Sequence, residues 1–198
     1  MKHALLQNSQ GTQPDVIMDD VFPEGVVDLD YSAESRTLLV ATAAGSMTLL
    51  RRDGSLVRTN RSLEDIRSVV WSDAGNFGAA IVGRNQVVCF DADLNVEWDV
   101  KVTGQVRAIT MTPHGSHLAV CADSSHTHIV TTDRKQIGKV ESTRPLDYVQ
   151  FVAEEPRFVG AAEFGHLCCH QLDGKELWNQ RLSTNVGGMS VTSCGKRI

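Results

Sequence analysis

Short stretches of alternating apolar and polar residues follow one another through most of the chain, and turn-forming residues separate them. The segment from Ile66 to Val100 shows the arrangement clearly. Alternation over about four to eight residues indicates a β-strand, and Asp, Asn or Gly between such runs indicates a tight turn. The segment therefore predicts four short strands, at 66–71, 78–82, 86–91 and 96–100, with turns at 72–75, 83–85 and 93–95.

Three sequence markers recur in one register, each with a step of 40 residues. Self-similarity at a fixed period is the signature of repeat architectures. The markers are a pair of apolar residues three positions apart, a turn aspartate, and a bulky residue two positions after the apolar pair. They are Val26/Leu29, Ile66/Val69, Val106/Ile109, Leu146/Val149 and Val186/Met189; Asp53, Asp93, Asp133 and Asp173; and Tyr31, Trp71, Met111, Phe151 and Val191.

This repeat predicts an all-β protein built of propeller blades, each a four-stranded antiparallel sheet, repeating every 40 residues. A sheet that is apolar on both faces is stable only when neighbours cover it, so the units must stack face to face. No segment has a convincing helical period, and the repeat places Arg61–Arg67 in a loop. The predicted blades are 25–64, 65–104, 105–144 and 145–184, with a partial blade at 185–198.

Two segments carry a resemblance to known families. Val106–Gly115 looks like the first strand and turn of a WD-type blade, and Asp173–Trp178 resembles the Asp-x-x-Gly-Lys-x-x-Trp ending of quinoprotein-like repeats. Over residues 25–198, the chain therefore resembles the WD-repeat-like and quinoprotein-like β-propeller superfamily. The Trp-Asp and Gly-His dipeptides of the WD family are missing, so its hydrogen-bond network is not carried over to this chain.

The two ends of the chain fall in the middle of a repeat. Residues 1–24 hold two weak strand patterns, His3–Gln7 and Asp15–Met18, which the register places as outer strands of a preceding or closing blade. Propeller rings usually have about four to eight blades. We expect a fragment of a longer ring of about seven blades; the alternatives are an oligomer whose chains share one ring and a closed five-bladed monomer. Open blade edges would allow self-association.

Composition and charge narrow the range of partners. The formal net charge is -5, which argues against a general nucleic-acid binder, because such a protein needs a basic field. No apolar run approaches the roughly 20 residues of a membrane-spanning helix, and the N-terminus lacks a signal-peptide core. The five cysteines, odd in number and irregularly spaced, predict buried reduced thiols in a cytoplasmic protein: Cys89, Cys121, Cys168, Cys169 and Cys194.

One segment, His166–His170, could carry metal or nucleophile chemistry. On a strand, His166, Cys168 and His170 point to one face, a spacing that could bind zinc, and Cys168 could act as a nucleophile beside a histidine. The equivalent positions of other repeats hold Gln86, Val88 and Phe90. This comparison favours an ordinary core strand, and we predict no catalytic residue, no metal site and no cofactor.

The remaining candidates are Arg67, Arg107 and Asp147, which share one repeat position near the start of the first strand. In a propeller this position lies near the mouth of the hub, where the three could bind a polar ligand or an acidic partner segment; as ordinary surface charges they would be solvated or paired with one another. We therefore predict a non-enzymatic protein-interaction or scaffold module with a protein or peptide partner. The alternative is a sensor or enzyme with a small-ligand site at the hub.

Overall fold

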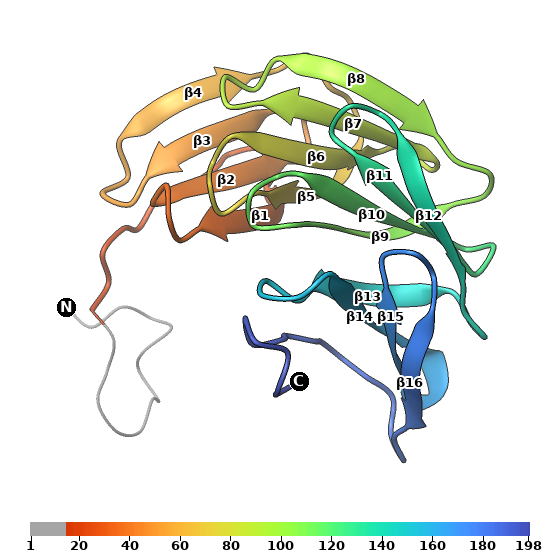
Figure 1. Ribbon diagram of the computed structural model, residues 1–198. Coiled ribbons are helices and arrows are strands. Elements are labelled where there is room, and N and C mark those ends of the chain that lie inside the picture. Colours follow the sequence, from red (N-terminus) through yellow and green to blue (C-terminus); the bar gives the residue numbers. More distant parts are fainter. Residues whose placement is uncertain (1–14) are drawn as a thin grey trace.

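The computed structural model describes residues 15–198, and its regular secondary structure consists almost wholly of β-strands (Figure 1). The strands form four antiparallel sheets of four, each a meander in which neighbouring strands follow one another in sequence. The predicted all-β fold, with four-stranded sheets repeating every 40 residues, is confirmed. Blade 1 contains β1 (Val26–Ser32), β2 (Thr37–Thr42), β3 (Met47–Arg51) and β4 (Leu56–Asn60); blade 2 contains β5 (Ile66–Trp71), β6 (Phe77–Val82), β7 (Gln86–Asp91) and β8 (Val96–Lys101). Blade 3 contains β9 (Val106–Met111), β10 (His117–Ala122), β11 (His126–Thr131) and β12 (Gln136–Glu141); blade 4 contains β13 (Leu146–Phe151), β14 (Arg157–Ala162), β15 (His166–Gln171) and β16 (Glu176–Arg181).

The blades fan around a common axis as an open arc, with the first strand of each blade innermost (Figure 1). Apolar side chains of adjacent sheets interlock between the blades. Leu39 and Met47 of blade 1 pack with Trp71 and Phe90 of blade 2 in one fully buried cluster. Comparable clusters join blade 2 to blade 3 and blade 3 to blade 4. Each sheet thus hides an apolar face of its neighbour, as the stacking argument requires.

A bulge occurs at the same place in the first strand of every blade. In blade 2, Ile66 pairs with Val82 and Ser68 with Ile81, so that Arg67 has no partner in the ladder. The same register shift recurs in the other three blades. A bulge strengthens the local twist and redirects one side chain, so the recurrence gives each blade the same twist beside the hub.

The segment after β16 begins a fifth unit. Thr192 N–H donates to Arg197 O, as Thr112 N–H donates to His117 O in blade 3, and Gly195 has a φ of 67° where Gly115 has 69°. Val191 is buried against Val152 and Val159 of blade 4, among other residues. The segment therefore forms the first turn of a repeat although residues 182–198 include no assigned strand.

The N-terminal segment differs from the expectation where the structure describes it. Residues 15–24 form no strand, whereas the pattern of Asp15–Met18 indicated one. Ile17 and Met18 instead line a hollow beside Arg51 and Arg52 of blade 1, and Ile17 remains 58% exposed. The other pattern, His3–Gln7, lies outside the described residues.

Helical structure is limited to a single 3-10 turn, η2 (Glu163–Gly165), among residues 15–198. No helix in this part of the chain is long and apolar enough to span a membrane. All five cysteines are free thiols, and four of them are buried. Burial raises the pKa of Cys121 and of Cys168 to about 12, so both stay protonated at neutral pH.

Candidate interaction site at the propeller hub

The carboxyl ends of the first strands converge on a cavity of about 330 Å³ at one end of the hub. Its lining repeats with the blades, because equivalent residues of all five repeats contribute to it. Three positions of the repeat supply the wall: the residue directly before the bulky marker, the marker itself, and a residue of the next turn. The lining residues are Asp30, Val70, Thr110 and Gln150; Tyr31, Trp71, Met111, Phe151 and Val191; and Asp73, Pro113, Ala153 and Ser193.

The bulky marker residues form the apolar part of this wall. Trp71 is 4% exposed and Phe151 6% exposed, so both lie mainly between blades, whereas Tyr31 is 44% exposed. Trp71 Nε1 donates to Thr37 Oγ1 at 3.0 Å, which fixes the indole against blade 1. The bulky marker residues therefore pack between the blades and also line the cavity.

Asp30 is the charged residue of the first wall position. Its Oδ2 accepts a hydrogen bond from the Trp71 backbone N–H at 2.8 Å, across the interface between blades 1 and 2. The pKa of Asp30 is raised to about 6: burial is the largest cause, the backbone hydrogen bonds from Trp71 and Tyr31 oppose the shift, and the carboxylates of Asp28 and Asp73 contribute to it. The hub thus contains a carboxyl group in which negative charge is poorly compensated.

Gln150 occupies the repeat position of Asp30 and makes the corresponding contact. Its Oε1 accepts a hydrogen bond from the Val191 N–H at 2.9 Å, joining blade 4 to the fifth unit as Asp30 joins blade 1 to blade 2. The two equivalent contacts show that this position is used to align successive inner strands. They also leave one acid and one neutral amide facing the same cavity.

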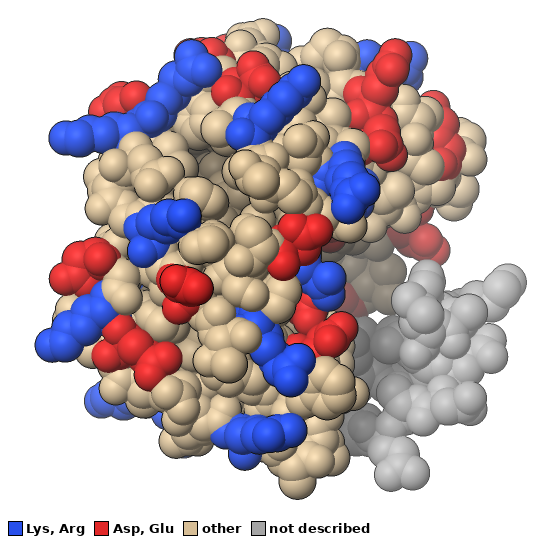
Figure 2. Space-filling view, turned by 90° about the vertical axis from the view of Figure 1, so that its right-hand side faces the viewer, with Lys and Arg blue, Asp and Glu red and all other residues tan. Residues whose placement is uncertain are grey.

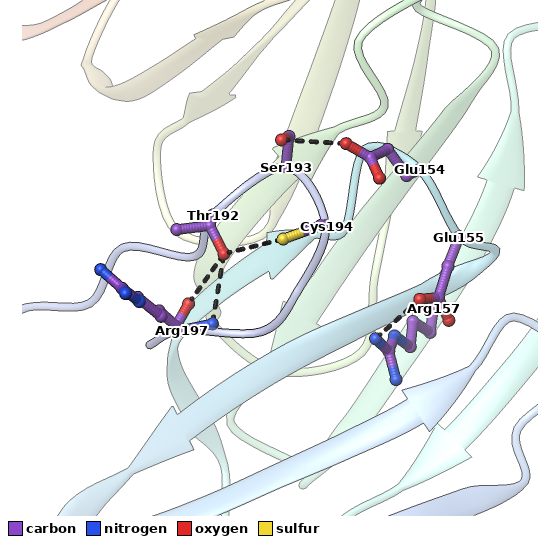
Figure 3. A network of polar contacts seen from close by, with 7 residues as sticks. All are labelled: Glu154, Glu155, Arg157, Thr192, Ser193, Cys194 and Arg197. Atoms are coloured by element: carbon purple, nitrogen blue, oxygen red, sulfur yellow. Dashed lines mark hydrogen bonds and ion pairs between the residues drawn. The ribbon is translucent and has the colours of Figure 1, made fainter.

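The turns at this mouth are tied to one another. Ser193 Oγ donates to Glu154 Oε1 at 3.1 Å, and Glu154 N–H donates to Ser193 O at 3.1 Å, which connects the fifth unit to blade 4 (Figure 3). Within the fifth unit, Thr192 Oγ1 accepts from Arg197 N–H at 3.2 Å. The rim on this side is therefore a network of polar contacts.

The predicted hub-mouth residues Arg67, Arg107 and Asp147 lie at the opposite end of the first strands. Each is the unpaired bulge residue of its strand. Arg107 Nε donates to Asp147 Oδ1 at 2.7 Å, and Arg107 also lies 3.9 Å from Glu163 Oε1. Arg107 and Asp147 line one small hollow, whereas Arg67 lines another and donates to the Gly83 and Val106 carbonyls. Arg107 and Asp147 thus contact each other directly, and Arg67 contacts the backbone of the residue before Arg107.

Figure 2 shows the face that bears the connections between blades. Basic and acidic side chains are interleaved over it, and neither sign forms a continuous field. A general nucleic-acid surface needs a sustained excess of Lys and Arg, and this face does not present one.

The residues of β15 considered as zinc ligands are His166, Cys168 and His170, and His170 lies in the core. His170 is 2% exposed and stacks on Phe158 with ring centroids 5.6 Å apart, and neither ring nitrogen has a hydrogen-bond partner. Burial lowers the pKa of His170, so the ring is neutral at pH 7. No group of three potential ligands that could hold a metal ion occurs within residues 15–198. His170 therefore serves as a core side chain in the position of Phe90.

Reasoning from the sequence alone did not single out Asp30 and Gln150 as site residues. Both directly precede bulky markers, Tyr31 and Phe151, that the repeat had identified. They could have been found by comparing the residue directly before each bulky marker in successive repeats, because equivalent positions of the blades surround the hub.

Comparisons with known proteins agree on the fold alone. No family model and no curated protein sequence matches the chain. The structure is similar to the β-propeller domain of Myceliophteria thermophila Cps50 (Swd1), with a TM-score of 0.77 and 13% identity, covering 92% of this chain and 63% of that one. It is also similar to Kuenenia stuttgartiensis hydrazine synthase, with a TM-score of 0.74 and 15% identity, covering 95% of this chain and 57% of that one. The β-propeller fold expected from the sequence is thus confirmed, and the chain spans less than two thirds of either structure.

Proposed function

We propose that this chain is a non-enzymatic protein-interaction module that binds a segment of a partner protein at its hub. The observation that carries the proposal is the cavity of about 330 Å³ to which all five repeats contribute. Binding sites are usually concave, and this one combines polar side chains, among them Asp30, Thr110 and Gln150, with the ring of Tyr31. Blades stacked through buried clusters supply a rigid frame for it.

The chemistry of the chain favours binding over catalysis. The buried thiols of Cys121 and Cys168 are protonated, and the buried His170 stacks on an aromatic ring. The carboxyl of Asp30 aligns two blades by accepting the Trp71 N–H. These groups serve packing and alignment. Five free cysteines also support our proposal of a reducing, cytoplasmic location.

The opposite mouth, with Arg67, Arg107 and Asp147, is a second proposed contact surface. Because Arg107 and Asp147 neutralise one another, we assign it the weaker role. The alternative function, a small-ligand sensor or an enzyme with a polar site at the hub, gains support from a cavity volume within the range of about 300–1,000 Å³ that suits small ligands.

The test is selection of peptides from a random displayed library against the full chain, followed by calorimetry with the synthetic peptide of highest enrichment. An Ala153→Trp variant places a bulky neutral side chain at an exposed turn position of the cavity lining and should weaken peptide binding at least about tenfold. An Arg107→Ala variant, at the other mouth, should change it less than about threefold. Failure to enrich any peptide sequence, or equal binding by the Ala153→Trp variant, would overturn the proposal.

A further inference from the structure

We propose that the hub cavity receives a cationic side chain, a lysine or an arginine, from the bound partner segment. This inference rests on the proposed function and names the chemistry that the site selects. It is carried by the sign of the lining charges, by the exposed ring of Tyr31 beside them and by the size of the cavity.

The charges of the described lining have one sign. Asp30 and Asp73 are its carboxylates, and among residues 15–198 neither Lys nor Arg lines the cavity. In the described part of the chain, residues 15–198, no basic side chain lies within salt-bridge distance of Asp30. A half-buried carboxylate without a cation attracts one, since the interaction is stronger in a site of low dielectric than in water.

The walls suit the rest of such a side chain. Tyr31, which is 44% exposed, supplies ring surface along which the methylene groups of lysine or arginine can pack, whereas Trp71, Phe151 and Met111 lie mainly between the blades. Tyr31 is the exposed aromatic ring among them, and an aromatic face next to a carboxylate adds attraction for a cation. The cavity can thus accept both the methylene groups and the charged group of a lysine or arginine side chain.

The volume limits what can enter. A cavity of about 330 Å³ holds a single long side chain or a small molecule but not a folded element. The backbone of the partner segment would therefore lie across the mouth, over the turns that carry Asp73 and Ser193. This arrangement makes the inserted side chain the main determinant of specificity.

Two substitutions can together move a carboxylate from one repeat position of the cavity lining to its equivalent in another blade, which tests the inferred preference for a cation. Asp30→Asn removes the carboxylate but keeps an acceptor for the Trp71 N–H. Gln150→Glu adds a carboxylate at the equivalent position and keeps an acceptor for the Val191 N–H. Asp133→Asn removes the same charge from an exposed turn of blade 3 and serves as the matched control.

The probes are three capped pentapeptides with alanine and glycine around a central arginine, lysine or citrulline, titrated into the full chain by calorimetry. Citrulline matches arginine in shape and lacks its charge. We expect the arginine or lysine peptide to bind at least about tenfold more tightly than the citrulline peptide. Asp30→Asn should abolish that preference, Asp30→Asn/Gln150→Glu should restore it to within about threefold, and Asp133→Asn should leave it unchanged.

Equal binding of the charged and citrulline peptides, or an unchanged preference in Asp30→Asn, would overturn the inference. If a library-selected peptide still binds at the hub and loses affinity in Ala153→Trp, the proposed function stands while the cation preference falls. If no peptide of any kind binds at the hub, the proposed function itself falls. Thermal unfolding of each variant confirms that a loss of binding is not a loss of fold.

Discussion

At the scale of single residues, His170 shows how one repeat position tolerates different chemistry. It stacks on Phe158 in the core, where both ring nitrogens lack hydrogen-bond partners, whereas blade 2 has Phe90 at this position. A buried polar group without partners costs about 1–3 kcal/mol. His170→Phe should therefore raise the free energy of unfolding by about 1–3 kcal/mol in urea denaturation followed by tryptophan fluorescence.

The same substitution should change the acid sensitivity of the protein. Because burial lowers the pKa of His170, the unfolded chain binds a proton more readily than the folded one, and stability is lost as the pH falls below about 6.5. His170→Phe should reduce this loss, whereas His166→Phe, on the partly exposed neighbour, should not. An unchanged pH dependence in His170→Phe would contradict the assignment of His170 as a neutral core residue.

Asp30 should produce the opposite pH dependence. Its pKa is raised from 3.8 to about 6, so the folded state holds the proton more tightly than the unfolded state. The resulting stability is fully present below about pH 4 and is lost as the pH rises through 6. Asp28 and Asp73 add repulsion when all three carboxylates are charged.

At pH 7.5 the free energy of unfolding of Asp30→Asn should accordingly be about 1–2 kcal/mol higher than that of the native chain. This figure allows for the partial exposure of the carboxyl group. Near pH 3.5 the two proteins should be equally stable. Urea titrations at both pH values measure the difference. A native chain that is the more stable of the two at pH 7.5 would show that the carboxylate is compensated in the fold.

At the scale of the element, the tight spacing of strands shows in Gly78 of β6. A Cβ added there would lie 2.3 Å from Phe90 and 2.7 Å from Trp71, both in the interface with blade 1. Gly78→Ala should lower the free energy of unfolding by about 1–3 kcal/mol, the usual effect of overpacking a core. Gly187→Ala is the control, because nothing lies within 4 Å of its added Cβ; calorimetric melting of both variants separates the two cases.

Much of the element level was predictable from the sequence, since the strands follow from alternation and the turns from Asp, Asn and Gly. Residues 66–71 and 86–91 form strands with the predicted bounds. The bulges were not predictable, because Arg67, Arg107 and Asp147 share a repeat position without any residue type that demands a bulge. Their register depends on pairing across the sheet, which no local pattern encodes. For the same reason the site at the other mouth, around Asp30 and Gln150, became visible only once the blades were assembled.

At the scale of the whole molecule, the fifth unit is held to blade 4 by one small apolar cluster and by the hydrogen bonds of Gln150 and Glu154. Val191 is 7% exposed and packs with Val152, Val159 and Cys169. Val191→Asp should detach residues 186–198 locally, so that trypsin cleaves after Lys196 at least about tenfold faster, while the main unfolding transition changes little. Ile198→Asp, at a residue that is 54% exposed, should leave the cleavage rate unchanged; equal cleavage of both variants would contradict docking of this unit.

The central claim is that equivalent residues of five repeats form one binding site at the hub. Hydrogen–deuterium exchange of the full chain, with and without the library-selected peptide, tests it most directly. Protection should concentrate at the carboxyl ends of the first strands and their turns, at 30–33, 70–73, 110–113, 150–153 and 190–193. Protection confined to the mouth with Arg67, Arg107 and Asp147, or to the outer strands β4, β8, β12 and β16, would contradict the account.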